Sequence, residues 1–152
     1  MIYVIDHKDS FTHNVVHQLS LFDKVECDDF SKVSTSKLNQ ASTIVFSPGP
    51  GSPKDYPLSS NIYKRYKGKK RIIGICLGFQ QILFSEGAKI IEQNKIYHGF
   101  QSEVIVNKSS KLFKDGQKFK VGRYHSLKLK EPFIAENFDI AMRCVISGAA
   151  MS

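Results

Sequence analysis

The sequence has few cysteines, and no apolar run in it is long enough to cross a membrane. Cys27, Cys76 and Cys144 are an odd and sparse set without metal-ligand spacing, which points away from a disulfide framework and predicts reduced thiols in a cytoplasmic protein. No His, Cys and carboxylate residues gather at ligand spacing, and no Gly-x-Gly-x-x-Gly opens a helix, so the sequence predicts neither a metal nor an organic cofactor. The N-terminus does not resemble a signal peptide, because polar residues 6–9 follow the first short apolar stretch at once.

Length and composition predict one packed domain spanning residues 1–152. Hydrophobic residues make up 41% and charged residues 24% of the chain, which is typical of a globular protein. The formal net charge of +8 raises the alternative of nucleic-acid binding. A solvated rim around a helix end explains the basic residues better, since no RNA-recognition strand, zinc finger or helix-turn-helix motif accompanies them. We therefore expect no nucleic-acid and no membrane partner; the basic residues are Lys64, Arg65, Lys67, Lys69, Lys70 and Arg71.

The stretch from Arg71 to Gly87 has the pattern of a strand, a turn and a helix. Residues 72–75 are apolar or small without alternation, which favours a parallel strand covered on both faces. Apolar residues near helical spacing follow, and Gly87 is placed to end that helix.

Cys76 lies at the corner between this strand and this helix. Gly74 and Gly78 flank it at two residues on either side, which leaves room for a tight turn that pushes the thiol outward, as in a nucleophile elbow. The start of a helix favours a thiolate, the nucleophilic form of cysteine. The alternative is a buried structural cysteine, but the flanking glycines favour the nucleophile.

Strands and helices alternate along the first half of the chain and predict an α/β fold with a mostly parallel sheet. The expected strands are residues 3–5, 24–30 and 43–46, with a helix over residues 11–22 capped by Asp9 or Ser10 and a helical turn within residues 34–40.

The third strand runs into the Pro-Gly loop, Ser47–Pro53, in which prolines and glycines exclude both helix and strand ladder. Loops that follow parallel strands lie at one edge of the sheet, so this loop and Cys76 are expected to be neighbours. Its glycines allow close approach to a ligand; the alternative is a simple rigid turn.

Beyond Gly87 the pattern changes to short strands separated by turns, without a convincing helix. This predicts a mixed or antiparallel extension of the sheet. The expected strands are residues 89–92, 102–106, 119–121, 127–129 and 140–142.

With these pieces the chain resembles a class I glutamine amidotransferase, most closely the glutaminase subunits of anthranilate synthase and of para-aminobenzoate (aminodeoxychorismate) synthase. The resemblance spans nearly the whole chain, and five motifs occur in the family's order. They are Asp9-Ser-Phe-Thr12, Ser47-Pro-Gly-Pro-Gly-Ser-Pro53, Gly74-Ile-Cys-Leu-Gly-Phe-Gln80, His98-Gly99 and Arg123-Tyr-His-Ser-Leu127.

The resemblance implies a flavodoxin-like domain that hydrolyses L-glutamine to glutamate and passes ammonia to a chorismate-using synthase subunit. Cys76 matches the nucleophile that forms a glutamyl thioester. Gly51 and Leu77 match the residues whose backbone N–H groups form the oxyanion hole. The positions that match the glutamine pocket are Gly49, Pro50 and Gly51 in the loop, with Gln80, Ser126 and Leu127 at the amino-acid end of the substrate.

One family motif has no counterpart in this sequence, the His-Pro-Glu triplet that supplies the catalytic base and its orienting carboxylate. The last residues, 148–152, bear no likeness to the family, as expected after truncation or a frameshift. His125 is the nearest substitute, but a structural or surface role is favoured for all five histidines. We therefore expect little glutaminase activity, while Cys76 can still be alkylated. Without the family's final strand and helix, we also expect an open sheet edge or an apolar patch, and with it self-association or marginal stability. A monodisperse monomer with an ordinary melting transition would contradict this.

Smaller departures affect the rim of the site. His7-Lys8 replaces the Asn-Tyr usual in relatives, and Phe100 stands where Lys is common. The choice between anthranilate and para-aminobenzoate synthesis stays open. Two other functions also stay open: a protein that docks on the synthase subunit without supplying ammonia, and a different cysteine hydrolase on a similar scaffold.

Overall fold

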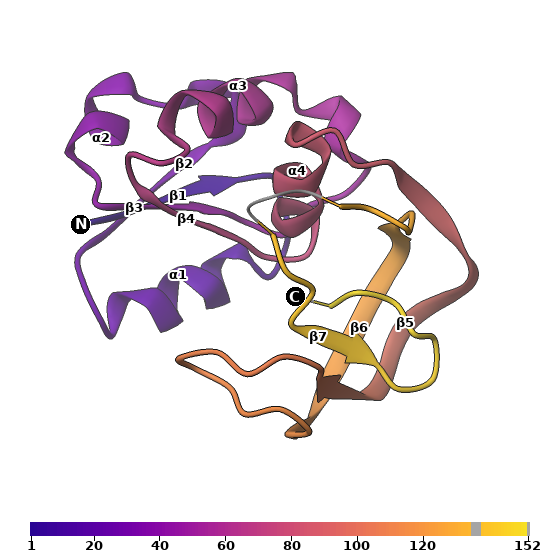
Figure 1. Ribbon diagram of the computed structural model, residues 1–152. Helices are drawn as coiled ribbons and strands as arrows, with labels where there is room; N and C mark the ends of the chain where they lie inside the picture. The colour runs from indigo at the N-terminus through magenta and orange to yellow at the C-terminus, as the bar shows by residue number, and fades with distance from the viewer. Residues whose placement is uncertain (135–137, 152) are drawn as a thin grey trace. The chain divides into compact units, whose positions relative to one another are not determined.

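The computed structural model describes residues 1–134 and 138–151, and the chain divides into two compact units, Met1–Gly87 and Ala88–Ser152 (Figure 1). Each unit is described by itself. The expectation of a single domain stays a prediction. Among the described residues, no helix is both long and apolar enough to span a bilayer.

The first unit is a four-stranded parallel sheet in the order β2-β1-β3-β4, with helices between the strands. Figure 1 shows α1 on the opposite side of this sheet from α2 and α3. The predicted α/β class is confirmed. The elements are β1 (Ile2–Asp6), α1 (Thr12–Ser20), β2 (Val25–Asp29), α2 (Thr35–Gln40), β3 (Thr43–Phe46), α3 (Pro57–Tyr66), β4 (Arg71–Gly74) and α4 (Leu77–Ser85), with short 3₁₀ turns at Phe30–Lys32 and Pro53–Asp55.

The core of this unit lies on both faces of β1 and β3. Tyr3, Val4 and Ile5 and residues 44–46 are fully buried, because helices cover each face of the two central strands. On one face, Val16 and Leu19 of α1 pack against the side chains of alternate strand residues. The two central strands therefore form the buried centre of this unit.

The strand that leads to Cys76 is not central. β4 has a strand neighbour on one side only within this sheet, and Ile73 is 45% exposed. The prediction that residues 72–75 are covered on both faces is therefore wrong: their unbroken apolar pattern belongs here to an edge strand. Self-association through this edge stays a prediction.

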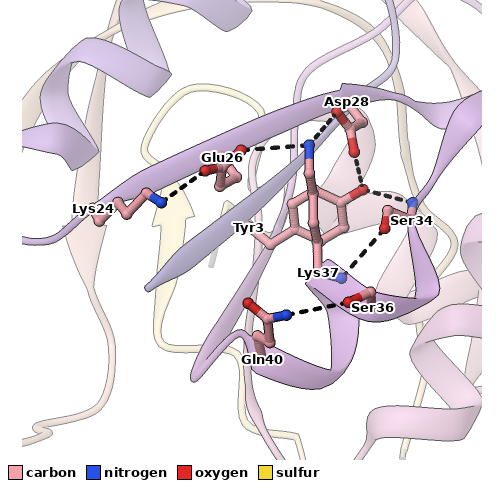
Figure 2. A network of polar contacts seen from close by, with 8 residues as sticks. All are labelled: Tyr3, Lys24, Glu26, Asp28, Ser34, Ser36, Lys37 and Gln40. Carbon is pink, nitrogen blue, oxygen red and sulfur yellow. Dashed lines mark hydrogen bonds and ion pairs between the residues drawn. The ribbon is translucent and has the colours of Figure 1, made fainter.

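A polar network joins α2 to the edge strand β2 (Figure 2). The Tyr3 hydroxyl donates to Asp28 Oδ2 at 2.6 Å and accepts from the Ser34 backbone N–H at 2.9 Å. Lys37 Nζ lies 2.9 Å from Asp28 Oδ1 and 3.4 Å from Glu26 Oε2. The hydrogen bond from Tyr3, followed by that from Lys37, holds the pKa of Asp28 below its usual value. These bonds explain how a strand interrupted by acidic residues still forms.

The second unit is an antiparallel three-stranded sheet in the order β6-β5-β7. Its strands are β5 (Ile90–Val106), β6 (Lys118–Leu129) and β7 (Met142–Cys144). Two predictions are wrong here: the sheet is separate rather than an extension of the first, and four of the five expected strands merge pairwise into β5 and β6. Register shifts near His98 and a positive φ of 74° at Gly99 break the alternation that sequence reasoning relies on.

The end of the chain folds back on β7. Arg143 forms an antiparallel bridge with Ala150, and the Cys144 N–H donates to the Ala149 carbonyl at 3.0 Å. Ala149 and Ala150 are buried, and Gly148 adopts a left-handed φ of 64° that suits the reversal. Residues 148–150 therefore contribute to this unit.

Candidate active site

Cys76 occupies a strained corner between β4 and α4. Its φ of 55° and ψ of −107° lie in a region that residues with side chains rarely adopt. The side chain is exposed. The predicted tight strand-to-helix turn is confirmed, and its conformation is that of a nucleophile elbow.

Gly74 and Gly78 make this corner possible. A Cβ atom on Gly74 would lie less than 3.0 Å from the backbone of Gly78, and one on Gly78 would lie equally close to the backbone of Phe46 in β3. Real Cβ atoms essentially never approach that closely. The two glycines therefore let α4 start directly against the sheet.

The thiol of Cys76 is not the thiolate that its position at a helix start predicts. The protein atoms packed around the sulfur raise its pKa, although its outer face is open to solvent. The Leu77 N–H lowers the pKa by hydrogen bonding, and the Asp9 carboxylate raises it further. Desolvation therefore outweighs the helix start, and the resting thiol is neutral near pH 7.

This environment predicts a steep pH dependence of Cys76 alkylation. In a Cys27→Ala, Cys144→Ala background, the rate with iodoacetamide is expected to rise about tenfold per pH unit from pH 7 to pH 9, because only the thiolate reacts. The measurement is the second-order rate constant across that range. A rate that is already at its plateau at pH 7 would show that the pKa of the thiol is lowered instead.

The Pro-Gly loop lies against the start of α4. A Cβ on Gly49 would be 2.5 Å from His7 Cβ and 2.6 Å from Leu77 Cδ2, so the Gly49 backbone is wedged between those two side chains. Gly51 has a left-handed φ of 74°. The loop and the elbow follow neighbouring parallel strands, as predicted, and the structure brings them together.

Two further contacts hold the outer part of this loop. The Tyr56 hydroxyl donates to the Pro50 carbonyl at 2.9 Å. The Ser52 N–H donates to Asp55 Oδ2 at 2.8 Å. The loop is therefore a fixed structure rather than a free surface segment.

The remaining predicted pocket residues fall in both units. Gln80 is buried in the first turn of α4, and its N–H donates to the Cys76 carbonyl at 3.1 Å. Ser126 and Leu127 lie in β6 of the second unit, where the Leu127 carbonyl accepts from Gln93 Nε2 at 3.2 Å. The structure thus groups Gly49, Pro50, Gly51, Cys76, Leu77 and Gln80 in the first unit and places two predicted residues in the second. The assigned roles of all these residues stay predictions.

Two histidines, His7 and His125, are held by contacts within the structure. His7 is fully buried with both ring nitrogens next to serine oxygens, while His13 and His17 are exposed on α1. In the second unit, His125 Nε2 accepts from Arg123 Nε at 3.0 Å, and burial is the main cause of its lowered pKa. These contacts agree with the interpretation of His125 as a structural residue.

Sequence reasoning missed the part that two residues play in the structure. From the sequence, His7 is only a difference from the Asn usual in relatives, and this difference does not predict that His7 lies beside the Pro-Gly loop. Arg123 begins a sequence motif, but nothing in the sequence distinguishes a buried arginine from an exposed one.

Comparisons with known proteins agree with this geometry. Residues 3–151 match the family model described as glutamine amidotransferase class-I. Anthranilate synthase component 2 of Lactococcus lactis is 34% identical over 156 residues, covering 100% of this chain and 78% of the relative. The bifunctional protein TrpGD of Thermotoga maritima is 30% identical over 93% of this chain, which spans 25% of that protein.

Two solved structures share the fold. A GMP synthase subunit from Thermoplasma acidophilum superposes with a TM-score of 0.80 at 21% identity, covering 98% of this chain and 74% of that one. A glutamine amidotransferase from Thermotoga maritima superposes with a TM-score of 0.75 at 15% identity, covering 97% and 68%. These likenesses support the flavodoxin-like fold. The family model and the curated relatives show that this chain belongs to the class I glutamine amidotransferase family.

Proposed function

We propose that this chain is the glutaminase subunit of a chorismate-using synthase, which hydrolyses L-glutamine to glutamate and delivers the ammonia to its partner. The observation that carries this is the exposed Cys76 at a strained elbow, with the Pro-Gly loop packed against the next residue, Leu77. Relatives named anthranilate synthase component 2 support a synthase partner. The three unpaired thiols support a cytoplasmic location.

The chemistry starts with attack of the Cys76 thiolate on the side-chain amide carbon of glutamine. The C–S bond forms as the amide C=O becomes an oxyanion, which the N–H groups of Gly51 and Leu77 stabilise. The C–N bond then breaks, and the nitrogen leaves as ammonia after taking up the proton that the thiol lost when it formed the thiolate. Water hydrolyses the glutamyl thioester, which releases glutamate and restores the thiol.

The other pocket residues hold the substrate. Gly49 and Pro50 line the side-chain end of glutamine, and Gln80 binds its amino-acid end. A small polar substrate needs such convergent polar groups to orient it toward the thiol.

The step that this chain supports poorly is proton transfer. The Cys76 thiol has a raised pKa, and both ring nitrogens of the nearby buried His7 are occupied by serine groups. General acid–base catalysis contributes about 10²- to 10⁴-fold to such reactions. We therefore propose that residues 1–152 alone turn over glutamine slowly, although Cys76 can still react.

The test is conversion of glutamine to glutamate by this chain together with a chorismate-using synthase subunit. Three versions are compared: the chain itself, Cys76→Ala, and the chain extended by a segment that contains His-Pro-Glu. The extended version is expected to hydrolyse glutamine at least about 100-fold faster than the chain itself. Turnover by the chain itself that Cys76→Ala abolishes would show that another residue supplies the base. Use of anthranilate or aminodeoxychorismate synthase as the partner decides the pathway.

A second candidate function is docking on the synthase subunit without ammonia supply. The hydrogen bonds of both His7 ring nitrogens favour it, because they leave that histidine without a free nitrogen to act as a base. Binding to the partner with no glutamine-dependent product, in the extended version as well, would identify this function. The family match leaves an unrelated cysteine hydrolase without support.

A further inference from the structure

We propose that His7 is a positioning residue that fixes the Pro-Gly loop, residues 47–53, so that the Gly51 N–H points to the oxyanion of the reaction. This inference rests on the function proposed above.

His7 lies directly after β1 and has no solvent exposure. Its ring makes an edge contact with Tyr56 at a centroid distance of 4.7 Å and lies 6.1 Å from both Phe30 and Phe46. A buried polar ring must form hydrogen bonds, since each unpaired group costs about 1–3 kcal/mol. The bonds of His7 therefore define what the ring holds in place.

Those hydrogen bonds join the loop to two elements of the first unit. The Ser47 carbonyl can only accept, so the Nδ1 of His7, 3.2 Å away, carries the proton. Nε2 then accepts from the Ser59 hydroxyl of α3 at 2.9 Å. The His7 backbone N–H donates to Ser47 Oγ at 2.9 Å, and that hydroxyl donates onward to the Pro48 carbonyl. One residue thus binds both the carbonyl and the hydroxyl of the first loop residue.

The neutral form of His7 is the one that this arrangement needs. Burial lowers the pKa of the imidazole, opposed by the hydrogen bond with Ser47 and by the carboxylate of Asp6. The other groups in contact with the ring are aromatic rings and serines without charge. The ring therefore keeps one donor and one acceptor at neutral pH.

The same side chain also sets the distance between loop and elbow. Gly49 is wedged between His7 Cβ and Leu77 Cδ2, so a shift of His7 moves Gly49 relative to the start of α4. Tyr56 and Asp55 hold the outer part of the loop, whereas His7 holds the end next to β3. A displacement of about 1 Å in a reacting site lowers rates by roughly 10²-fold. Small changes at His7 are therefore expected to affect oxyanion stabilisation.

The test compares two reactions of Cys76 that need no general base. The 4-nitrophenyl γ-ester of glutamate acylates the thiol through an oxyanion: the C–S bond forms, the ester C–O bond breaks and nitrophenolate leaves. Iodoacetamide alkylates the thiol by displacing iodide without an oxyanion. The ratio of the two rate constants therefore reports the loop and not the reactivity of the thiol, and Cys76→Ala corrects for background.

His7→Phe keeps an aromatic ring but removes both ring hydrogen bonds, and it is expected to lower this ratio at least about tenfold. Ser59→Ala is the matched control, because it removes the Nε2 partner and leaves the bond to Ser47; its ratio is expected to stay within about twofold. His7→Asn, which retains an N–H donor, is expected to recover part of the loss. If His7→Phe does not fold, Ser47→Ala replaces it, with an expected loss of about threefold or more.

Equal ratios in His7→Phe and Ser59→Ala would overturn the proposal, since a merely stabilising residue lowers both reactions or neither. Amide hydrogen exchange of residues 47–53 separates this outcome from failure of the proposed function. Faster exchange in His7→Phe than in Ser59→Ala supports the hold of His7 on the loop, even if the ester does not acylate Cys76 and the glutaminase function is wrong. Unchanged exchange contradicts that hold directly.

Discussion

Replacing Gly78 by alanine is expected to lower the free energy of unfolding of the first unit by about 3 kcal/mol or more. Alanine is a better helix former than glycine by about 1 kcal/mol, so propensity alone predicts stabilisation in α4. The packing reverses the sign. The added methyl group would lie less than 3.0 Å from backbone atoms of Phe46, and β3 is a central strand that cannot move away without disturbing both its neighbours.

The measurement is native-state hydrogen exchange of the β1 and β3 amides, which reports the stability of this unit separately. Gly68→Ala is the control without a steric clash. Gly68 has a left-handed φ of 73°, and nothing lies within 4 Å of an added Cβ. We expect it to cost about 1 kcal/mol from backbone strain alone. A Gly78→Ala protein as stable as the unsubstituted chain would mean that the elbow is looser than described.

The second large effect is expected at Arg123, which is 1% exposed. Its guanidinium lies 3.7 Å from the centroid of the Tyr97 ring and donates to Gln93 Oε1 at 3.1 Å, to His125 Nε2 at 3.0 Å and to Cys144 Sγ at 3.2 Å. Within the described residues, none of these partners is a carboxylate. Arg123→Lys keeps the charge but loses the planar fork, so several buried groups lose their partners. We expect a loss of about 3 kcal/mol in the second unit.

Arg143→Lys provides the matched control in the same unit. Arg143 donates from two nitrogens to the carboxylate of Glu131, at 2.8 Å and 2.5 Å, and both side chains are about one-third exposed. Solvent-accessible ion pairs contribute about 0–1 kcal/mol, and Arg143 also donates to the Gly148 carbonyl at 2.8 Å, so this substitution is expected to cost clearly less than Arg123→Lys. For both variants, the free energy of unfolding of the second unit is measured by urea denaturation, with hydrogen exchange of the β5 amides as the readout. The opposite order would show that the partners of Arg123 reorganise at little cost.

Local steric patterns were predictable from the sequence. The glycines at 74 and 78 imply a turn with little space, and the structure places a backbone atom where each Cβ would stand. The bounds of β3 were also predictable, because they depend on neighbouring residues only.

Properties that depend on distant residues were not predictable. The edge position of β4 depends on strand order, and the raised pKa of Cys76 depends on how many atoms surround the sulfur. The merging of short segments into β5 depends on pairing with β6 across bulges. Burial of Arg123 likewise requires partners 21 to 30 residues away in the chain.

The division of the chain at Gly87 has a consequence for the timing of its synthesis. The contacts described above for the elbow lie within the first unit: Phe46 of β3 against Gly78, His7 against Gly49, and Tyr56 at Pro50. Domains generally fold in the order in which they leave the ribosome. The growing polypeptide therefore carries these residues before the strands of the second unit have been translated.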